Sequence, residues 1–170
     1  MTELDSHNTP LRGHRALRFG RWSEVGALYF LTFRVRSDCG PVLRDRACAE
    51  AVLRALHNLR IHGDVALLGY VIMPDHVHLM LTLRRGNLAN AVMRMRSRAG
   101  HSIRRLIGGR GPVWQRGFYD HLIRDEQDWG THMEYIHGNP VRAGLVTEPE
   151  EWLFSSAHPL ATEDIDHIDL

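Results

Sequence analysis

Two histidines separated by one apolar residue, His76 and His78, lie inside an apolar run of the sequence. In a β-strand, residues i and i+2 point to the same face, so both imidazoles are expected to point toward one spot. Val77 between them would then point the other way, into a core. Imidazole is the commonest side-chain metal ligand, and a strand holds such a pair rigidly. The pair indicates half of a metal site in an enzyme, although His-x-His alone is weak evidence in a chain with 12 histidines.

Further along the chain, Tyr135 and Asn139 are four residues apart, which places them on one face of a helix. A tyrosine can act as a nucleophile through its phenolate. An asparagine carbonyl is a hard oxygen ligand suited to Mg²⁺ or Mn²⁺. Together with His76 and His78, Asn139 would hold a divalent ion that polarises a scissile phosphate. The spacing therefore predicts a metal site beside a tyrosine nucleophile.

Other polar residues have simpler interpretations. Tyr119 is the alternative nucleophile, but it lies among apolar residues of an expected strand, which favours a structural role. His121, His132 and His137 could assist proton transfer near the nucleophile, although a surface or supporting position explains each of them more simply. Asp75 either orients a metal-binding imidazole or serves the turn in which it lies.

The arginines are unevenly distributed, although the formal net charge is only +1. The chain has no lysine; residues 76–119 contain nine arginines and no Asp or Glu, whereas residues 120–170 contain twelve acids and two arginines. Two causes explain the preference for arginine over lysine equally well: codon usage in a GC-rich genome and recognition of phosphate. Codon usage does not explain why residues 76–119 lack Asp and Glu. A basic stripe beside a metal site indicates a nucleic-acid substrate. The expected DNA-binding residues are Arg12, Arg15, Arg18, Arg21, Arg84, Arg85, Arg94, Arg98 and Arg105.

The elements that must position these residues follow from apolar periodicity and turn residues. The sequence predicts a strand at 27–36, a helix of about 16 residues capped by Asp45, strands at 65–73 and 76–83, a helix at about 88–107 capped by Asn87, a short strand within 113–124 and a helix from Asp125 to about His137. Asn139-Pro140 is expected to end the last helix. This order predicts an α+β fold, a single antiparallel sheet with helices packed on it, on a ferredoxin-like plan related to the split βαβ unit.

The chain is expected to form one domain with two flanking segments. The catalytic domain is expected at 20–160. A flexible basic N-terminal arm at 1–19 precedes it, and a loose acidic C-terminal tail at 161–170, which is a candidate to fold over the arginines, follows it. No apolar run has the length of a membrane span, and the polar first residues predict that the chain carries no signal peptide. With only Cys39 and Cys48, the composition predicts a cytoplasmic protein with reduced thiols.

Five segments between residues 20 and 157 resemble, in order, the REP-associated tyrosine transposases, which belong to the IS200-like Y1 branch of the HUH endonucleases. They are GRWSEVGALYFLTFRVR (20–36), GYVIMPDHVHLML (69–81), GPVWQRGFYDHLIRDEQD (111–128), YIHGNPVRAGLV (135–146) and PEEWLFSSA (149–157). The most specific part is the combination Pro-x-His-hydrophobic-His, Trp-Gln-x-x-Phe-Tyr and Tyr-Ile-x-x-Asn-Pro-Val. The first nineteen and the last ten residues fall outside the resemblance.

The resemblance implies that His76 and His78 are the HUH metal pair, that Tyr135 is the catalytic nucleophile and that Asn139 is the third ligand of Mg²⁺ or Mn²⁺. It implies that a monomer or homodimer nicks single-stranded DNA at REP-like hairpins and transfers the strand through a 5′-phosphotyrosine intermediate. Two alternatives stay open: a protein that binds DNA hairpins without cutting them, and a hydrolase that holds zinc with His-x-His. The second would leave Tyr135 and Asn139 without a role.

Overall fold

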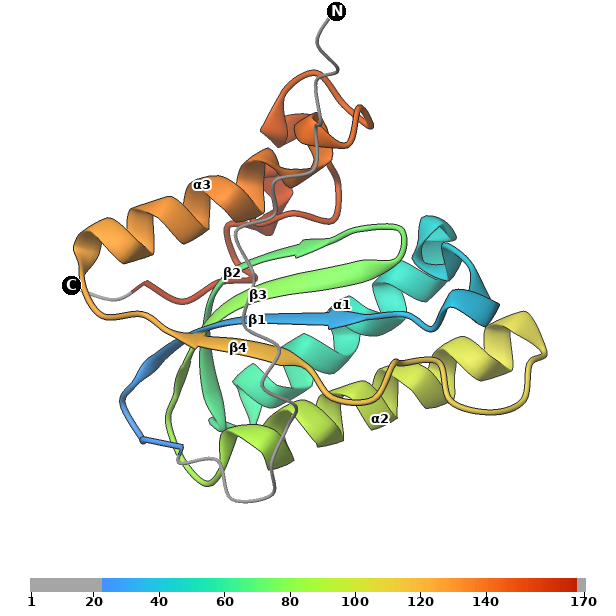
Figure 1. Cartoon of the computed structure of the whole chain (residues 1–170), viewed down its shortest axis with the longest axis horizontal. Coiled ribbons are helices and arrows are strands. Elements are labelled where there is room, and N and C mark those ends of the chain that lie inside the picture. Colours follow the sequence, from blue (N-terminus) through green and yellow to red (C-terminus); the bar gives the residue numbers. More distant parts are fainter. Residues whose placement is uncertain (1–22, 168–170) are drawn as a thin grey trace, which may run out of the picture.

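The computed structural model describes residues 23–167, in which four strands form one antiparallel sheet in the order β2-β3-β1-β4 (Figure 1). The strands are β1 (Leu28–Arg34), β2 (Val65–Ile72), β3 (His76–Leu83) and β4 (Tyr119–Leu122), and the helices are α1 (Arg46–Ile61), α2 (Leu88–Ile107) and α3 (Glu126–Arg142). The predicted order of strands and helices and the α+β class are confirmed.

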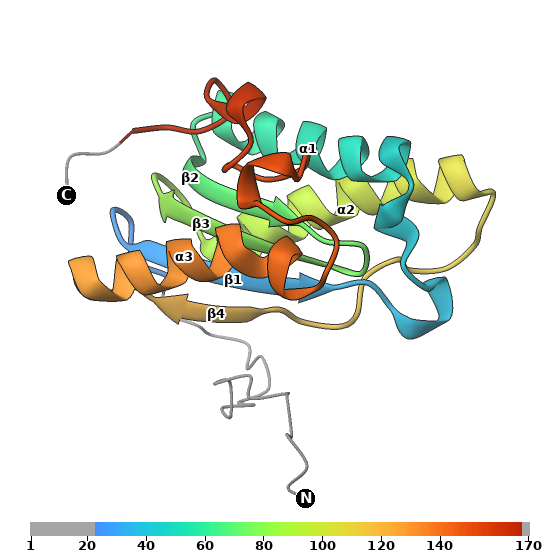
Figure 2. The ribbon, with the colours of Figure 1, turned by 90° about the horizontal axis from the view of Figure 1, so that it is seen from above.

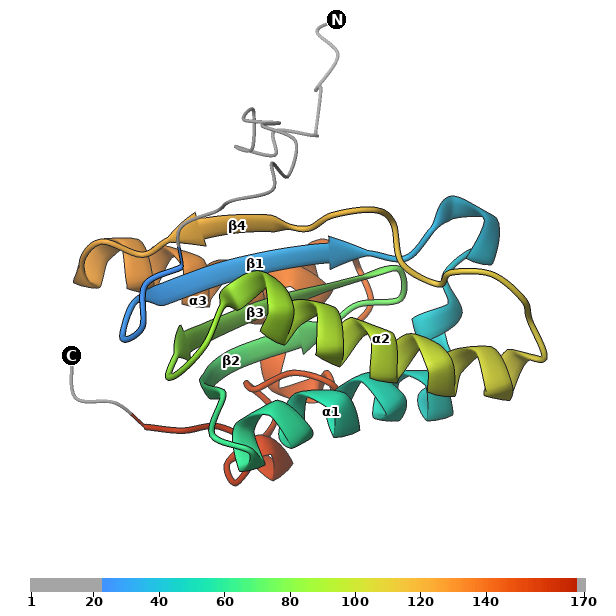
Figure 3. The ribbon, with the colours of Figure 1, turned by 90° about the horizontal axis from the view of Figure 1, so that it is seen from below.

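The sheet separates two helix layers. α1 and α2 cover one face and α3 covers the other (Figures 2 and 3). Val77 and Leu79 of β3 belong to the larger core under α1 and α2, whereas Ile136 of α3 belongs to a smaller core on the opposite face. Because side chains alternate along a strand, His76 and His78 face α3, as their spacing predicts.

Each helix begins at a side chain that caps it. Asp45, Asn87 and Asp125 accept a hydrogen bond from the backbone amide three residues later, at 3.0, 3.2 and 2.8 Å. These acceptors satisfy amides that have no partner within the first turn of a helix. Local sequence therefore predicts where all three helices start, and the observed bounds of α1 and α2 agree with the prediction.

The end of α3 differs from the sequence prediction. The helix does not stop before Pro140 but continues to Arg142, and the amide four residues after Asn139 still donates to the Asn139 carbonyl at 3.0 Å. Pro140 is buried together with Ile136 and Asn139, so packing against the sheet outweighs the local preference of a residue before proline. As a result, Tyr135 and Asn139 lie on one continuous helix.

The C-terminal segment is docked as far as the structure describes it. Trp152 Nε1 donates to a β2 carbonyl at 3.0 Å. Asp166 forms an ion pair with Arg60 of α1 at 3.1 Å and accepts from the Leu67 amide at 2.9 Å. The prediction of a loose tail is therefore wrong for residues 161–167, because the acids meet a cation and an edge-strand amide that sequence alone does not bring to them. These acids lie against α1 and β2, and not over the arginines of α2.

Three other expectations concern the ends, membranes and cysteines. The predicted N-terminal arm lies outside the described residues. Within residues 23–167, no helix combines the length and apolar character needed to cross a bilayer. Cys39 and Cys48 are both free thiols.

Candidate metal and nucleophile site

β3 and α3 bring the four predicted site residues together between sheet and helix. The ring centroids of His76 and His78 are 4.8 Å apart, and the ring of Tyr135 lies 5.2 Å from that of His78. Asn139, one helical turn after Tyr135, is buried, and its side chain lies close enough to His76 to act on the pKa of that imidazole. A single chain therefore supplies the imidazole pair, the amide and the phenol.

Each imidazole is oriented through its Nδ1 atom. Thr32 Oγ1 on β1 lies 2.7 Å from Nδ1 of His78, and Asp75 Oδ1 lies 2.6 Å from Nδ1 of His76. Contacts of this kind fix the tautomer and direction of metal-binding imidazoles. Of the two interpretations of Asp75, this contact supports the orienting one. Sequence reasoning misses Thr32, because its role depends on the register that places Thr32 opposite His78.

His78 Nε2 tests most directly whether a metal ion fits here. This atom is buried and has no hydrogen-bond partner among the described residues. A buried polar atom in this state is costly unless water or an ion meets it. Two imidazoles and an amide oxygen form a donor set suited to divalent ions such as Mn²⁺. The residues present therefore fit a divalent ion.

Burial lowers the pKa of both imidazoles. The pKa of His78 lies well below its ordinary value, because burial disfavours the cation and because His76, Arg34 and Arg142 add positive charge nearby. Burial also lowers the pKa of His76, and the contact with Asp75 opposes it only in part. Both rings are therefore neutral at pH 7, which is the form that binds a metal ion.

Two exposed arginines flank these residues, and the sequence prediction does not single them out. Arg34, at the end of β1, forms an ion pair with Asp75 at 3.5 Å. Arg142, in the last turn of α3, places its guanidinium 4.6 Å from the ring centroid of Tyr135 and donates to the Tyr135 carbonyl. They come from distant parts of the chain, so no spacing relates them. Together they give the rim of the site a positive charge suited to phosphate.

Phe30 of β1 packs against the aromatic rings of the site. Its ring stacks on His78 with centroids 5.4 Å apart and meets the ring of Tyr135 edge-on at 6.1 Å. It also contacts His132 at 4.7 Å and Tyr119 at 6.3 Å. Burial raises the pKa of Tyr119. The structural role of Tyr119 stays a prediction, and its packing against Phe30 agrees with it.

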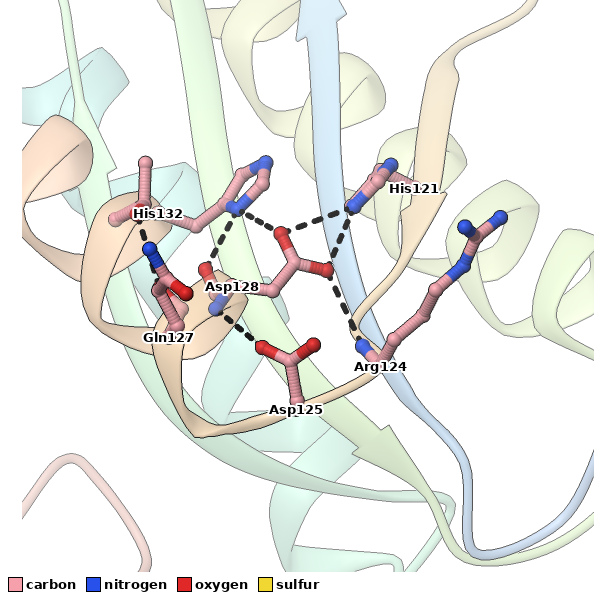
Figure 4. Close-up of polar contacts among 7 residues, drawn as sticks. His121, Arg124, Asp125, Gln127, Asp128 and His132 are labelled. Atoms are coloured by element: carbon pink, nitrogen blue, oxygen red, sulfur yellow. Dashed lines mark hydrogen bonds and ion pairs between the residues drawn. The ribbon is translucent and has the colours of Figure 1, made fainter.

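A second polar group lies where β4 meets the start of α3 (Figure 4). One ligand-capable atom from each of His121, Asp128 and His132 lies within 4.8 Å of the other two, which makes this a possible metal site. Burial alone would raise the pKa of Asp128, but hydrogen bonds from His121 and from the Arg124 amide bring it below its ordinary value. The carboxyl group is therefore ionised at neutral pH.

The three histidines considered for proton transfer have other partners. His121 and His132 both contact the Asp128 carboxylate. His137 Nε2 lies 2.9 Å from Ser156 Oγ. Among the described residues, none of the three is hydrogen-bonded to the Tyr135 side chain, so their assistance to Tyr135 stays a prediction without a contact behind it.

The predicted DNA-binding arginines do not gather at the imidazole pair. Arg12, Arg15, Arg18 and Arg21 lie outside the described residues. Arg94, Arg98 and Arg105 belong to α2, on the opposite face of the sheet (Figure 3), and Arg84 and Arg85 precede that helix. Arg85 and Arg94 form ion pairs with Asp64 at 3.0 and 2.7 Å. Their role in binding DNA stays a prediction.

Two further arginines of the acid-free block support the fold. The Arg96 guanidinium lies 5.7 Å from the ring centroid of Phe33 and donates to the Gly117 carbonyl at 2.7 Å. Burial lowers the pKa of Arg96 to about 10. Arg104 donates to the Gly111 carbonyl at 2.9 Å. These bonds fasten the loop before β4 to α2, so part of the block serves folding.

The fold and the site define an α+β protein in which a strand carries His-x-His and a covering helix carries Tyr and Asn. Residues 34–139, more than half of the chain, match the family model described as "Transposase IS200 like". The chain therefore belongs to the IS200-like transposases, a family of DNA-processing enzymes.

Two curated relatives extend the comparison. The REP-associated tyrosine transposase of Escherichia coli is 25% identical over 82% of each chain. A Haemophilus influenzae protein with the same name, given provisionally, is 29% identical over 78% of this chain and 81% of its own. A solved REP-associated tyrosine transposase bound to a REP hairpin has a TM-score of 0.70, 24% identity and 91% coverage of both chains, which confirms the fold.

Proposed function

We propose that this chain is a metal-dependent enzyme that nicks and rejoins single-stranded DNA at REP-like hairpins through a 5′-phosphotyrosine intermediate. The observation that carries the proposal is the convergence of His76, His78, Asn139 and Tyr135, with Nε2 of His78 buried and without a partner among the described residues. Family membership supports a DNA substrate. A cytoplasmic location, close to the genome, is part of the proposal.

The hairpin is inferred from the relatives. Two of them are named for their association with REP sequences, and the solved neighbour holds a REP hairpin. This chain would bind a hairpin of that type through phosphate contacts from arginine. The exposed arginines of α2 and the basic segment at 1–19 would supply those contacts. Since one chain supplies both the imidazole pair and the tyrosine, a monomer would be sufficient, and a homodimer is the alternative.

His76, His78 and Asn139 would hold Mg²⁺ or Mn²⁺, whose positive charge would neutralise a non-bridging oxygen of the target phosphate. Thr32 and Asp75 hold the two rings in a fixed direction through Nδ1. The same contacts keep Nε2 of each ring as the atom available to a ligand.

Tyr135 would act as the nucleophile. Its Oη forms a bond to phosphorus while the bond from phosphorus to the 3′ oxygen breaks. The phenol loses its proton and the 3′ oxygen takes one up, which gives a 5′-phosphotyrosine and a free 3′-OH. Attack of a 3′-OH on this link reverses the bond changes, so joining needs no ATP. Arg34 and Arg142 would attract the phosphates of the strand toward the tyrosine.

A denaturing gel tests the proposal. The full chain is incubated with Mn²⁺ and a REP-like single-stranded hairpin labelled at its 3′ end, so that the covalent adduct keeps the label. We expect an adduct from wild type and from Tyr119→Phe, and none from Tyr135→Phe. No wild-type adduct with any divalent ion would overturn the proposal, in favour of hairpin binding if the DNA is retained intact. Two free cleaved ends without an adduct would instead indicate a hydrolase.

A further inference from the structure

We propose that His121, Asp128 and His132 form a second divalent-metal site, of the zinc class, that fastens β4 to the first turns of α3. This site is separate from the His76–His78 group and goes beyond the nicking reaction. Two histidines and one carboxylate from two different elements converge at this point, where the strand that ends the sheet turns into the helix carrying the tyrosine (Figure 4).

The geometry shows a carboxylate with an imidazole at each oxygen. His121 Nε2 lies 2.9 Å from Asp128 Oδ2, and His132 Nδ1 lies 3.0 Å from Asp128 Oδ1. The two rings are nearly parallel, with centroids 4.7 Å apart and 18° between their planes. The Arg124 amide donates to Asp128 Oδ2 at 3.1 Å. Small movements of these side chains would admit an ion among the two nitrogens and the carboxylate.

The chemistry of the donors favours a zinc-like ion. Two imidazole nitrogens and one carboxylate oxygen are a common protein ligand set for Zn²⁺, with a fourth position open to water. His132 Nδ1 also lies 2.9 Å from the Asp128 carbonyl oxygen. Since a carbonyl and a carboxylate only accept, this nitrogen carries the ring proton in the metal-free structure. Binding an ion would move the proton to Nε2 of His132, and that of His121 to Nδ1, two nitrogens without a hydrogen bond to a described residue, so that the facing nitrogens offer their lone pairs and no proton is released. The side chains of His121 and His132 are 32% and 18% exposed, so an ion can reach them from solvent.

Local charge supports a cation at this place. Asp125, Glu126 and Asp128 cluster at the start of α3. A helix N-terminus by itself repels cations, but these three carboxylates offset it. Carboxylate and imidazole donors together also bind divalent transition ions more tightly than an amide oxygen with two imidazoles does. The second site is therefore expected to fill first with Zn²⁺ or Co²⁺.

An ion here would act on the nucleophile through packing. His132 lies three residues before Tyr135 on α3, and its ring contacts Phe30, which in turn meets both Tyr135 and His78. Joining His132 to β4 through a metal would restrict the first half of the helix relative to the sheet. We infer a structural ion whose binding raises the stability of the folded chain.

Co²⁺ titration of the full chain tests the site, because Co²⁺ reports tetrahedral nitrogen and oxygen donors by visible absorption. We expect His76→Ala to keep a tight Co²⁺ site and Asp128→Asn to bind that ion at least about tenfold more weakly. Zn²⁺ should raise the melting temperature of His76→Ala but not that of the double variant His76→Ala/Asp128→Asn, in which neither donor group is complete. Asparagine keeps the shape of the side chain and one acceptor oxygen, so Asp128→Asn should still fold, as circular dichroism without metal will show.

A second variant keeps the proposal testable if the first one does not fold. If Asp128→Asn is unfolded, His121→Gln removes a ligand on β4 and leaves the start of α3 unchanged, with the same loss of Co²⁺ affinity expected. Loss of all tight Co²⁺ binding in His76→Ala would overturn the second site. Equal Co²⁺ affinity in wild type and the ligand variants would overturn it as well. Neither result bears on the adduct formed by Tyr135, so the two proposals fail separately.

Discussion

Among single residues, His78 is held by contacts from several elements. Thr32 of β1 meets its Nδ1 atom, Phe30 stacks on one side of the ring and Tyr135 of α3 packs edge-on against it. Burial keeps the ring neutral. With Nδ1 occupied by a hydroxyl that can accept its proton, Nε2 carries the free lone pair. A neighbour on another strand therefore decides which nitrogen of His78 can bind a metal ion.

Replacing Thr32 with valine keeps the shape of the side chain and removes this hydroxyl. Without it, the tautomer and direction of His78 are less well fixed, so we expect half-maximal adduct formation to need about tenfold more Mn²⁺. The measurement is adduct yield against Mn²⁺ concentration. Thr82→Val, farther along β3, is the matched control and should leave the requirement unchanged. An unaltered requirement in Thr32→Val would show that the hydroxyl does not orient His78.

Among the elements, α3 matters most, because it carries both Tyr135 and Asn139 and its distance from the sheet sets where they lie. Gly69 of β2 makes room for it. A Cβ atom at Gly69 would lie 2.8 Å from Sδ of Met133, one of the side chains that α3 packs against the sheet. The pairing of β2 with β3 also shifts register between Leu67 and Gly69. This glycine therefore serves the close approach of helix and sheet.

Gly69→Val should push α3 away from the sheet. The larger side chain meets Met133, so we expect the free energy of unfolding to fall by about 2 kcal/mol, and adduct formation to fall with it. Urea denaturation and the adduct gel measure the two effects. In the Gly69→Val background, Met133→Ala should restore part of both, because it vacates the space that valine needs. Failure of this rescue would mean that the valine acts within the sheet and not through α3.

For the whole molecule, the sheet places the imidazole pair and the arginines of α2 on opposite faces. Asp64, just before β2, pairs with both Arg85 and Arg94. One carboxylate outside the acid-free block thus neutralises part of it, whereas Arg98 and Arg105 remain exposed. The positive electrostatic field of the acid-free block is therefore weaker than nine uncompensated arginines would produce.

The Asp64 pairs also predict a pH dependence of stability. Burial alone would raise the pKa of Asp64, but hydrogen bonds from Arg85 and Arg94 bring it below its ordinary value. A lowered folded-state pKa gives stability above the unfolded pKa of about 4, which is lost as the pH falls through the folded value. We expect Asp64→Asn to cost about 1 kcal/mol of unfolding free energy at pH 7. The cost should shrink at pH 3 in denaturant titrations; an equal cost at both pH values would contradict this origin.

The same carboxylate should limit DNA binding. Asp64→Asn is expected to tighten binding of single-stranded DNA at low salt, because it releases two cations. Arg98→Gln and Arg105→Gln should weaken binding, and each should reduce the slope of log affinity against log salt by about 0.7. Fluorescence anisotropy at several salt concentrations measures these slopes. Arg54→Gln on α1, outside the predicted set, is the control, and equal slopes for Arg54→Gln and Arg98→Gln would place the DNA elsewhere.

Local spacing in the sequence was sufficient to predict the helices and strands and the two residue pairs of the first site. Caps such as Asp45 and Asn87 predict helix starts, because they satisfy amides only three residues away. The i, i+2 spacing predicts that His76 and His78 share a face, and the i, i+4 spacing predicts the same for Tyr135 and Asn139. These relations lie within one element, where backbone geometry alone fixes direction.

Only the tertiary structure decided which distant residues meet. Sheet register places Thr32 beside His78, and packing carries α3 through Pro140, against the local preference of the chain. Tertiary packing likewise brings Asp166 to Arg60. It also places the arginines of α2 on the face of the sheet opposite the imidazole pair. Each of these arrangements depends on many contacts between segments far apart in the chain. No short stretch of sequence determines them.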